Sequence, residues 1–209
     1  MFRLQQLIEA LFPHYCCSCG LIGSPLCKNC YGLLEFCLRQ PTPPPSLNSV
    51  TCAVRYQDPA ANLIKKLKFG NIKSISQLAA EIIFTTTVLP KCDVVTAVPL
   101  HPSRLRQRGY NQAKEIAVHL AMLLNIPYSQ LLIRAKATKA QTSTRSKEAR
   151  QTNLEHAFQP KNLEQNLASK RILLVDDVYT TGATLTACAT ALAQAHPLKI
   201  HAVTLAIKQ

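Results

Sequence analysis

The sequence predicts an α/β protein with a parallel-sheet core and helices on both faces, preceded by a small cysteine-rich module. Two apolar segments, 93–98 and 171–175, are each followed by a polar loop and then by a helix-forming segment. An apolar segment without a polar face is typical of a strand that is buried on both sides of a parallel sheet. Alternation of strands and helices favours a sheet of this kind with helices on both faces.

Three regions are expected along the chain. Residues 1–40 form the N-terminal module, 41–49 a proline-rich linker, and 50–209 the α/β domain. The module begins with an amphipathic helix at 2–12, which is too short and too polar for a membrane span or a secretory signal, so we expect a cytoplasmic protein. In chain order, the α/β domain is expected to contain a strand at 50–56, helices at 60–69 and 75–89, a strand at 93–98, a helix opened by 109–112, strands at 131–134 and 171–175, a helix at 185–195 and a last strand at 200–207.

The segment after the 171–175 strand has the composition of a site for a sugar phosphate. Asp176 and Asp177 are expected at the carboxyl end of the strand, where ligands of open α/β sheets bind. The next loop is rich in small and hydroxyl side chains, and its helix offers N-terminal amide groups to a phosphate. Carboxylates repel phosphate and would bind hydroxyls. The alternative is an ordinary strand, acidic turn and helix cap. The loop residues are Tyr179, Thr180, Thr181, Gly182, Ala183 and Thr184.

Residues 172–184 resemble the binding signature of the type I phosphoribosyltransferases. The resemblance implies that Asp176 and Asp177 bind the ribose hydroxyls of phosphoribosyl pyrophosphate and that the loop 179–184 encloses its 5′-phosphate. It also implies the type I phosphoribosyltransferase fold for residues 50–209.

A second motif, residues 94–113, ends a strand in a proline and continues into a basic loop. Planar guanidinium groups bind phosphate oxygens in pairs, so the loop suits an anion. Its sequence, VPLHPSRLRQRGYNQA, is similar to that of the ComF family of competence proteins. The resemblance to phosphoribosyltransferases implies that this loop holds the pyrophosphate. The alternative is a solvated basic loop with a simple turn glycine. The residues concerned are Pro99, Arg104, Arg108, Gly109, Asn111 and Gln112.

Residues 134–158 are polar and basic and cannot contribute to a core. A long segment of this composition is expected to be a functional lid or a mobile surface hairpin. The segment is similar to that of ComF proteins at Arg134, Gln141, Thr142, Arg150, Asn153 and Phe158. This resemblance implies a flexible lid over the site, and the lid contains Gln141, Thr142, Arg150 and Asn153.

Four cysteines near the N-terminus have the spacing C-x2-C-x7-C-x2-C, namely Cys16, Cys19, Cys27 and Cys30. Four thiolates at such spacing can form a tetrahedral structural Zn²⁺ site. Cys17, Cys37 and His14 are possible substitutes. The alternative, buried or disulfide-bonded cysteines, is disfavoured by the odd count of nine and the lack of a secretory signal. ComF proteins typically begin with a zinc-finger-like segment of this kind.

The formal net charge of +13 is concentrated in a few segments. Lys65, Lys66 and Lys68 lie outside the three ligand motifs and are expected to form a surface for single-stranded DNA, which would be bound through its phosphates. A solvated basic face is the alternative.

The resemblance covers residues 13–208 and implies a ComF-like competence protein that handles single-stranded DNA, with competence-machinery proteins as further partners. If the protein is an enzyme, it would displace pyrophosphate from phosphoribosyl pyrophosphate, with Mg²⁺ neutralising the leaving group. A non-catalytic DNA or protein adaptor is the competing function, and a nucleobase salvage transferase is a third.

Overall fold

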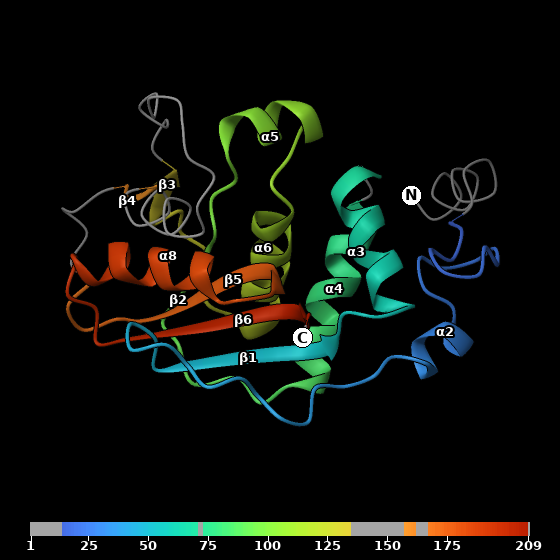
Figure 1. Ribbon diagram of the computed structural model, residues 1–209, viewed down its shortest axis with the longest axis horizontal. Coiled ribbons are helices and arrows are strands. Elements are labelled where there is room, and N and C mark those ends of the chain that lie inside the picture. Colours follow the sequence, from blue (N-terminus) through green and yellow to red (C-terminus); the bar gives the residue numbers. More distant parts are fainter. Residues whose placement is uncertain (1–13, 71–72, 135–156, 162–166, 209) are drawn as a thin grey trace, which may run out of the picture.

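The computed structural model describes residues 14–70, 73–134, 157–161 and 167–208 (Figure 1). The N-terminal helix expected at 2–12 lies outside these ranges. So do the four residues assigned to the lid, Gln141, Thr142, Arg150 and Asn153.

The core is a four-stranded parallel sheet in the order β1-β6-β5-β2. Its strands are β1 (Ser49–Arg55), β2 (Val94–Ala97), β5 (Arg171–Tyr179) and β6 (Lys199–Ile207). Side chains of β5 alternate between two hydrophobic clusters, with Leu173 and Val175 in one and Ile172 and Leu174 in the other. All four are fully buried, which confirms the prediction of a strand covered on both faces.

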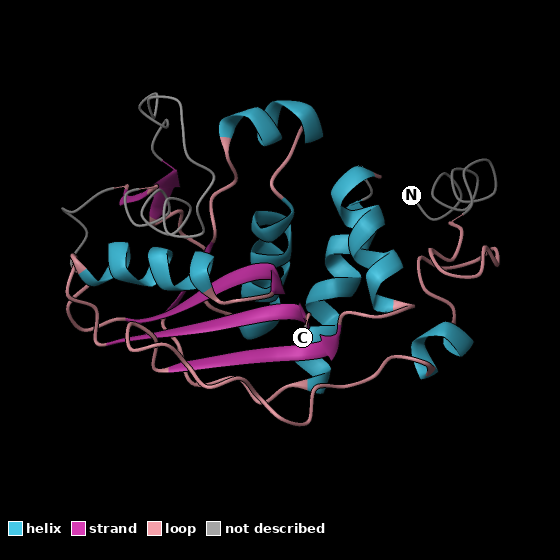
Figure 2. Cartoon of the chain, viewed as in Figure 1, coloured by secondary structure: helices cyan, strands magenta, loops and turns pink. Residues whose placement is uncertain are grey.

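Helices cover both faces of this sheet (Figure 2). α8 (Ala183–Ala193) packs on one face together with a small antiparallel pair, β3 (Leu132–Arg134) and β4 (Phe158–Pro160). α3 (Ala60–Phe69), α4 (Lys73–Thr86) and α6 (Gln112–Leu124) belong to the cluster on the other face. The α/β class with helices on both faces is therefore confirmed. β4 was not predicted, because a three-residue strand that ends in a proline has too little periodicity to be recognised.

The end of β5 and the structure of residues 102–108 differ from the prediction. β5 continues four residues beyond Val175, because Asp176, Val178 and Tyr179 stay paired in register with β6. Residues 102–108, expected as a loop, form the short helix α5 (Pro102–Arg108). Pro102 supplies the fixed φ of a first helical residue, and the His101 side chain accepts a hydrogen bond from the Ser103 N–H at 3.2 Å.

The cysteine-rich segment lies against the sheet. Its short helix is α2 (Lys28–Gly32), and the segment after it runs antiparallel to β1 through a bridge between Phe36 and Val54. Cys16, Cys27 and Cys30 belong to the same buried cluster as the apolar side chains of α3 and α4. Within the described ranges, no helix has the length and hydropathy required to cross a membrane.

Candidate functional site

A cavity of about 340 Å³ opens at the carboxyl ends of β2 and β5. We call it the strand-end cavity. The structure brings both predicted ligand motifs to it, although 58 residues separate them in the sequence. Nine of the predicted residues line it: Pro99, Arg104, Arg108, Asn111, Gln112, Asp176, Asp177, Thr180 and Thr184. The remaining predicted residues of the two loops are not among those that line it: Gly109, Tyr179, Thr181, Gly182 and Ala183.

The two acids have different surroundings. Asp177 is only 6% exposed, and its Oδ2 accepts a hydrogen bond from Gln112 Nε2 at 3.0 Å and lies 3.1 Å from Lys68 Nζ. Asp176 has no cationic partner within ion-pair distance in the described residues, and its Oδ1 accepts from the Asp177 N–H at 2.8 Å. Burial, and then the charge of Asp177, raise the pKa of Asp176 to about 8. With no ligand bound, the Asp176 carboxyl therefore keeps its proton near neutral pH.

The loop that follows the acids depends on Gly182. Gly182 has a φ of +77° and precedes the first residue of α8. A Cβ at this position would lie 2.8 Å from Tyr179 Oη, so a side chain would be strained by both its backbone conformation and this contact. The tight turn brings the first turn of α8 to the cavity, where Thr184 lines the wall. Backbone amide groups at a helix N-terminus are suited to bind a phosphate.

Asn111 fixes the basic segment to the sheet. Its Oδ1 accepts from the Ala113 N–H at 3.1 Å and caps α6, while its Nδ2 donates to the Val98 carbonyl at 3.0 Å. Gly109 ends α5 with a φ of +77°. These bonds hold the strand-end proline and the start of α6 in one arrangement, from which Arg104 and Arg108 line the cavity.

Lys68 lies apart from the two other lysines that are expected to bind DNA. Its sequence neighbours Lys65 and Lys66 are exposed, but Lys68 lines the strand-end cavity and pairs with Asp177. The C-terminal end of α3 is attached to the basic segment, since Tyr110 Oη donates to the Leu67 carbonyl and Arg108 stacks over the Phe69 ring at 5.4 Å. The sequence held one signal for this: Lys68 follows buried Ile64 by four residues and so continues the buried stripe of α3.

Three more residues line the cavity, and of these only Arg134 belongs to a predicted motif, the lid pattern. Arg134, at the end of β3, stacks over the Phe158 ring at 5.1 Å. Tyr56 follows β1, and Lys208 follows β6 with its Nζ 5.4 Å from the centre of the Tyr56 ring. Because β1 and β6 lie on the side of β5 away from β2, Tyr56 and Lys208 lie at the end of the cavity away from the β2 loop.

The predicted group of four cysteines is assembled. The sulfur atoms of Cys16, Cys19, Cys27 and Cys30 all lie within 4.8 Å of one another. Gly20 and Gly23, with φ of +78° and +129°, form the turns between the two pairs. Cys17, Cys37 and His14 are not part of the group, and all nine cysteines are free of disulfides.

The chemistry of these four thiols fits Zn²⁺. Burial alone would raise the pKa of Cys16, but N–H groups of Cys19, Cys27 and Ser18 outweigh it and lower the pKa to about 6. Burial and the neighbouring thiols raise the pKa of Cys30 to about 12. A compact thiolate group of this kind is a suitable tetrahedral site for Zn²⁺, whose charge would allow all four sulfurs to ionise.

Comparison with known proteins identifies the family. The family described as "Phosphoribosyl transferase domain" matches residues 106–209. Competence protein F of Haemophilus influenzae is 31% identical over 184 residues, which cover 81% of this chain and 79% of that protein. The DNA utilization protein YhgH of Escherichia coli K12 is 31% identical over 178 residues, 81% and 74% of the two chains. Competence protein ComFC of Bacillus subtilis is 32% identical over 133 residues, 62% and 52% of the two chains.

Solved structures with a similar arrangement include the adenine phosphoribosyltransferase of Thermoanaerobacter pseudethanolicus. Its TM-score is 0.43 at 16% identity, with 71% of this chain and 84% of that chain covered. The glutamine phosphoribosylpyrophosphate amidotransferase of B. subtilis has a TM-score of 0.42 at 21% identity and covers 63% and 25% of the two chains. The identity and coverage of the competence proteins establish that this chain belongs to the competence protein F family and carries a phosphoribosyltransferase-type domain.

Proposed function

We propose that the strand-end cavity binds phosphoribosyl pyrophosphate. The observation that carries this proposal is the convergence of three groups on one cavity: the two acids, the first turn of α8, and the arginines of the β2 loop. Five cationic side chains line the cavity (Lys68, Arg104, Arg108, Arg134 and Lys208) against the two acids, so it favours a polyanion.

Each part of the ligand matches a different group of residues in the cavity. The 5′-phosphate would bind the amide groups at the start of α8 and the hydroxyls of Thr180 and Thr184. The ribose hydroxyls would donate to Asp176 and Asp177, which a phosphate would avoid. The pyrophosphate would lie against Arg104 and Arg108, whose guanidinium groups can each bind two oxygens.

Mg²⁺ fits the same end of the cavity. Carboxylate, hydroxyl and pyrophosphate oxygens are the hard ligands that Mg²⁺ prefers, and the acids lie beside the wall assigned to the pyrophosphate. When bound with the ligand, the ion would neutralise charge on the pyrophosphate. The residues of the chain would orient the ribose and hold the leaving group.

Phosphoribosyl transfer is the reaction that this arrangement supports. The bond from the ribose C1 to a pyrophosphate oxygen breaks with its electron pair leaving on pyrophosphate, and the acceptor's lone pair forms the new bond to C1. The acceptor proton passes to water. Because an in-line displacement brings the acceptor from the face opposite the pyrophosphate, the acceptor would approach from the end with Tyr56 and Lys208.

The double substitution Asp176→Asn with Asp177→Asn tests the ligand assignment. We expect it to lower the affinity for phosphoribosyl pyrophosphate with Mg²⁺ by about 100-fold or more, since both carboxyl groups that would accept from the ribose hydroxyls are replaced. Calorimetric titration measures the affinity, and Asp58→Asn, an exposed acid outside the cavity, is the matched control. Equal affinities of the double variant and the wild type would remove the assignment.

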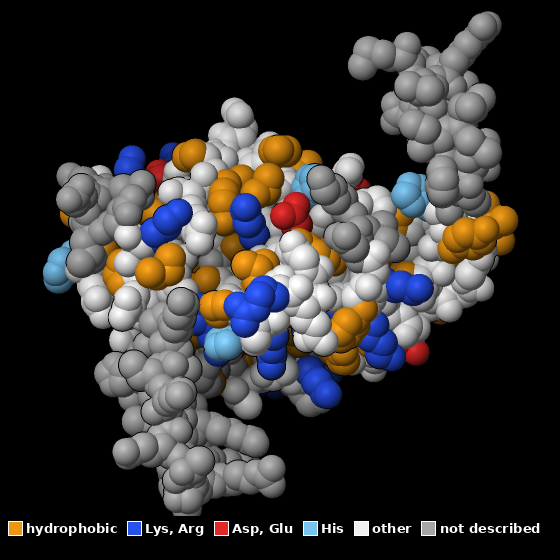
Figure 3. Space-filling model, turned by 90° about the horizontal axis from the view of Figure 1, so that it is seen from above, with side chains coloured by type: hydrophobic (Ala, Val, Ile, Leu, Met, Phe, Trp, Pro, Cys, Tyr) orange, Lys and Arg blue, Asp and Glu red, His pale blue; other side chains and the backbone are white. Residues whose placement is uncertain are grey.

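Single-stranded DNA handling in the cytoplasm, alongside other competence proteins, is the second function we propose. Relatives named for competence and DNA utilization favour it, as do Lys65 and Lys66, which are exposed on α3. Basic side chains are also spread over the face of the molecule seen in Figure 3. Phosphate contacts from these residues would bind DNA with little sequence preference.

Replacing Lys65 and Lys66 by Gln tests this surface. The slope of log affinity against log salt concentration should flatten by about 1.4 for single-stranded DNA, because two phosphate contacts are lost. The control is Lys170→Gln with Lys199→Gln, which removes two exposed charges at the amino ends of β5 and β6. An unchanged slope in the first variant would place the DNA on another surface.

A further inference from the structure

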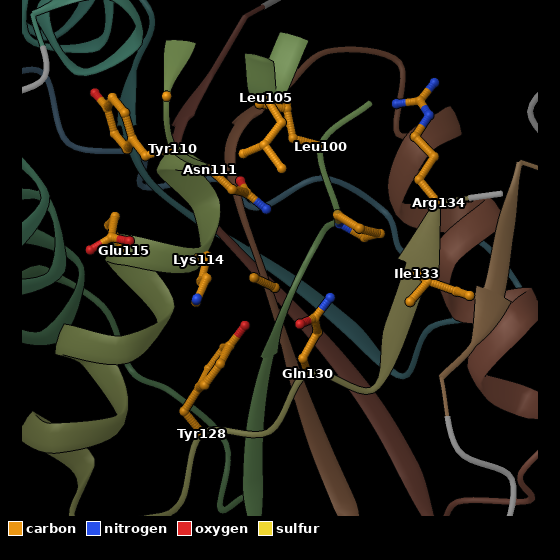
Figure 4. Close-up of a pocket in the computed structure, with 13 residues that line it drawn as sticks. Leu100, Leu105, Tyr110, Asn111, Lys114, Glu115, Tyr128, Gln130, Ile133 and Arg134 are labelled. Carbon is orange, nitrogen blue, oxygen red and sulfur yellow. The ribbon is translucent and has the colours of Figure 1, made fainter. Parts of the chain in front are cut away.

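A second cavity, of about 420 Å³, lies beside the strand-end cavity (Figure 4). We call it the side cavity. Pro99, Leu100, Asn111 and Arg134 line both cavities, so the β2 loop forms the wall between them. No predicted function uses the side cavity, and its volume lies in the range of small-molecule sites.

Three polar groups converge inside it. Lys114 from the first turn of α6, the Tyr128 hydroxyl and the Gln130 amide point toward its centre in Figure 4. Burial, and then the charge of Glu115, raise the pKa of Tyr128, so its hydroxyl keeps the proton and can donate. Gln130 Nε2 donates one N–H to the Leu132 carbonyl at 3.4 Å. Its second N–H, Lys114 and Tyr128 can offer hydrogen-bond donors to the same space.

The position of Tyr128 is fixed by the sheet. Pro127 accepts a hydrogen bond from the Val95 N–H at 2.9 Å, and the Ser129 N–H donates to the Val95 carbonyl at 2.9 Å. Asn111 is held by its two bonds to Ala113 and Val98. The polar side of the side cavity is thus built on rigid backbone, as an effective binding site requires.

Charge and apolar surface define the ligand class. The charged residues that line the cavity are Lys114, Arg134 and Glu115, which leaves a net positive balance. Glu115 points away from the centre, and in the described part of the chain Lys114 has no ion pair. Leu100, Leu105 and Ile133 supply apolar walls. An anionic group on an apolar or flat body matches both halves of this lining.

Under the proposed function, the acceptor would not enter through the side cavity. It lies beyond Pro99 and Leu100, on the side assigned to the leaving pyrophosphate, whereas an in-line acceptor must arrive from the opposite side. A ligand here would therefore act on the β2 loop and not on C1.

We propose that the side cavity binds a small organic anion, with its charged group on Lys114, Tyr128 and Gln130 and its body against Leu100, Leu105 and Ile133. Because Leu100 and Arg134 line both cavities, occupancy of the side cavity also changes the affinity of the strand-end cavity. Anion binding in the side cavity does not depend on the proposed function. The coupling between the two cavities rests on the proposed phosphoribosyl pyrophosphate site.

Matched ligand pairs test the binding site. Nicotinate with nicotinamide, and adenosine monophosphate with adenosine, differ by one anionic group, and ligand-observed NMR gives their affinities for the full chain. We expect the anionic member of at least one pair to bind about tenfold tighter or more. Lys114→Gln should abolish that preference, and Tyr128→Phe should weaken it.

Two controls separate the side cavity from other basic sites. Arg108→Gln, which alters only the strand-end cavity, and Lys91→Gln, an exposed lysine before β2, should both retain the preference. Absence of the preference in the wild type at millimolar ligand, or its survival in Lys114→Gln, would overturn the site.

Coupling is tested by titrating phosphoribosyl pyrophosphate with and without the anion that binds best. The two ligands must change each other's affinity by the same factor. Equal affinities under both conditions would overturn the coupling alone, whereas failure of phosphoribosyl pyrophosphate to bind in either condition would overturn the proposed function and leave the anion test unaffected.

Discussion

The Asp177 carboxyl group contacts Gln112 at 3.0 Å and Lys68 at 3.1 Å in the strand-end cavity. Lys68 comes from α3, more than a hundred residues earlier in the chain than Asp177. The Lys68 ammonium group lies 3.1 Å from Asp177 Oδ2, beside the carboxyl group proposed to bind the ribose hydroxyls. It would also lie near the negative charges of a bound ligand.

Lys68→Gln is predicted to lower the affinity for phosphoribosyl pyrophosphate by about tenfold or more, because one charged contact at a partly buried site is lost. Lys65→Gln, on the exposed side of the same helix, should leave the affinity unchanged. Calorimetric titration of both variants measures the difference. Equal losses in the two variants would show that Lys68 acts only through the overall charge of α3.

The pKa of Asp176 predicts how stability depends on pH. In the unfolded chain this carboxyl titrates near pH 4, and in the folded protein its pKa is about 8. The folded state therefore holds the proton more tightly, and this contribution to stability is complete below pH 4 and is lost as pH rises toward 8.

Asp176→Asn should remove this loss of stability at high pH, because the asparagine side chain does not titrate. Without ligand or Mg²⁺, the free energy of unfolding of the variant minus that of the wild type should be larger at pH 8 than at pH 5 by at least about 1 kcal/mol. Urea denaturation at the two pH values measures it. A difference that stays constant with pH would contradict a raised pKa at Asp176.

Residue types and spacing were sufficient to predict that the two acids and the arginines belong to one site. They were also sufficient to predict that the four cysteines form one group. They were insufficient for Tyr56 and Lys208, which reach the site only because β1 and β6 end beside β5. Nothing local in the sequence marks either residue. Lys68 was grouped with Lys65 and Lys66 because a run of lysines was treated as one face of a helix, whereas its side chain lines the cavity.

At the scale of elements, strand pairing and helix capping set the shape of the site. The pairing of β5 with β6 continues through Tyr179, so the acids extend from a paired strand and not from a loop. The apolar run ends at Val175, so composition could not predict that the strand continues to Tyr179. That continuation depends on pairing with β6. α5 was missed since its charged sequence, PSRLRQR, has no buried residue.

Asn111 links two elements and gives a prediction at this scale. Asn111→Ala removes the cap of α6 and the bond to Val98, so we expect the free energy of unfolding to fall by about 1 to 2 kcal/mol. Asn111→Ser keeps a capping oxygen but cannot reach Val98, and its stability should stay within about 0.5 kcal/mol of the wild type.

Both Asn111 variants should bind pyrophosphate more weakly, because the β2 loop is no longer held to the start of α6. Urea denaturation and pyrophosphate titration separate the two effects. Wild-type pyrophosphate affinity in Asn111→Ser would show that the bond to Val98 does not position the loop.

At the scale of the whole molecule, the cysteine group and the sheet share one buried cluster. Removing a metal from this group should therefore disturb the domain as well as the N-terminal segment. We predict that the purified protein contains one Zn²⁺ and that Cys30→Ser loses it, with a fall of several degrees in the melting temperature.

Cys17→Ser provides the matched control, because Cys17 is adjacent in sequence but outside the four-sulfur group. It should keep the metal and the melting temperature of the wild type. Metal analysis and thermal melting of the two variants give the result, and loss of zinc in Cys17→Ser but not in Cys30→Ser would reverse the assignment.

The most direct test of the central claim is a comparison of three ligands on the wild-type protein with Mg²⁺: phosphoribosyl pyrophosphate, ribose 5-phosphate and inorganic pyrophosphate. If one cavity holds a phosphate, a diol and a pyrophosphate together, the complete ligand should bind at least about tenfold tighter than either part and should displace both. An affinity no greater than that of pyrophosphate alone, or a part that stays bound when phosphoribosyl pyrophosphate saturates the protein, would contradict a single composite site.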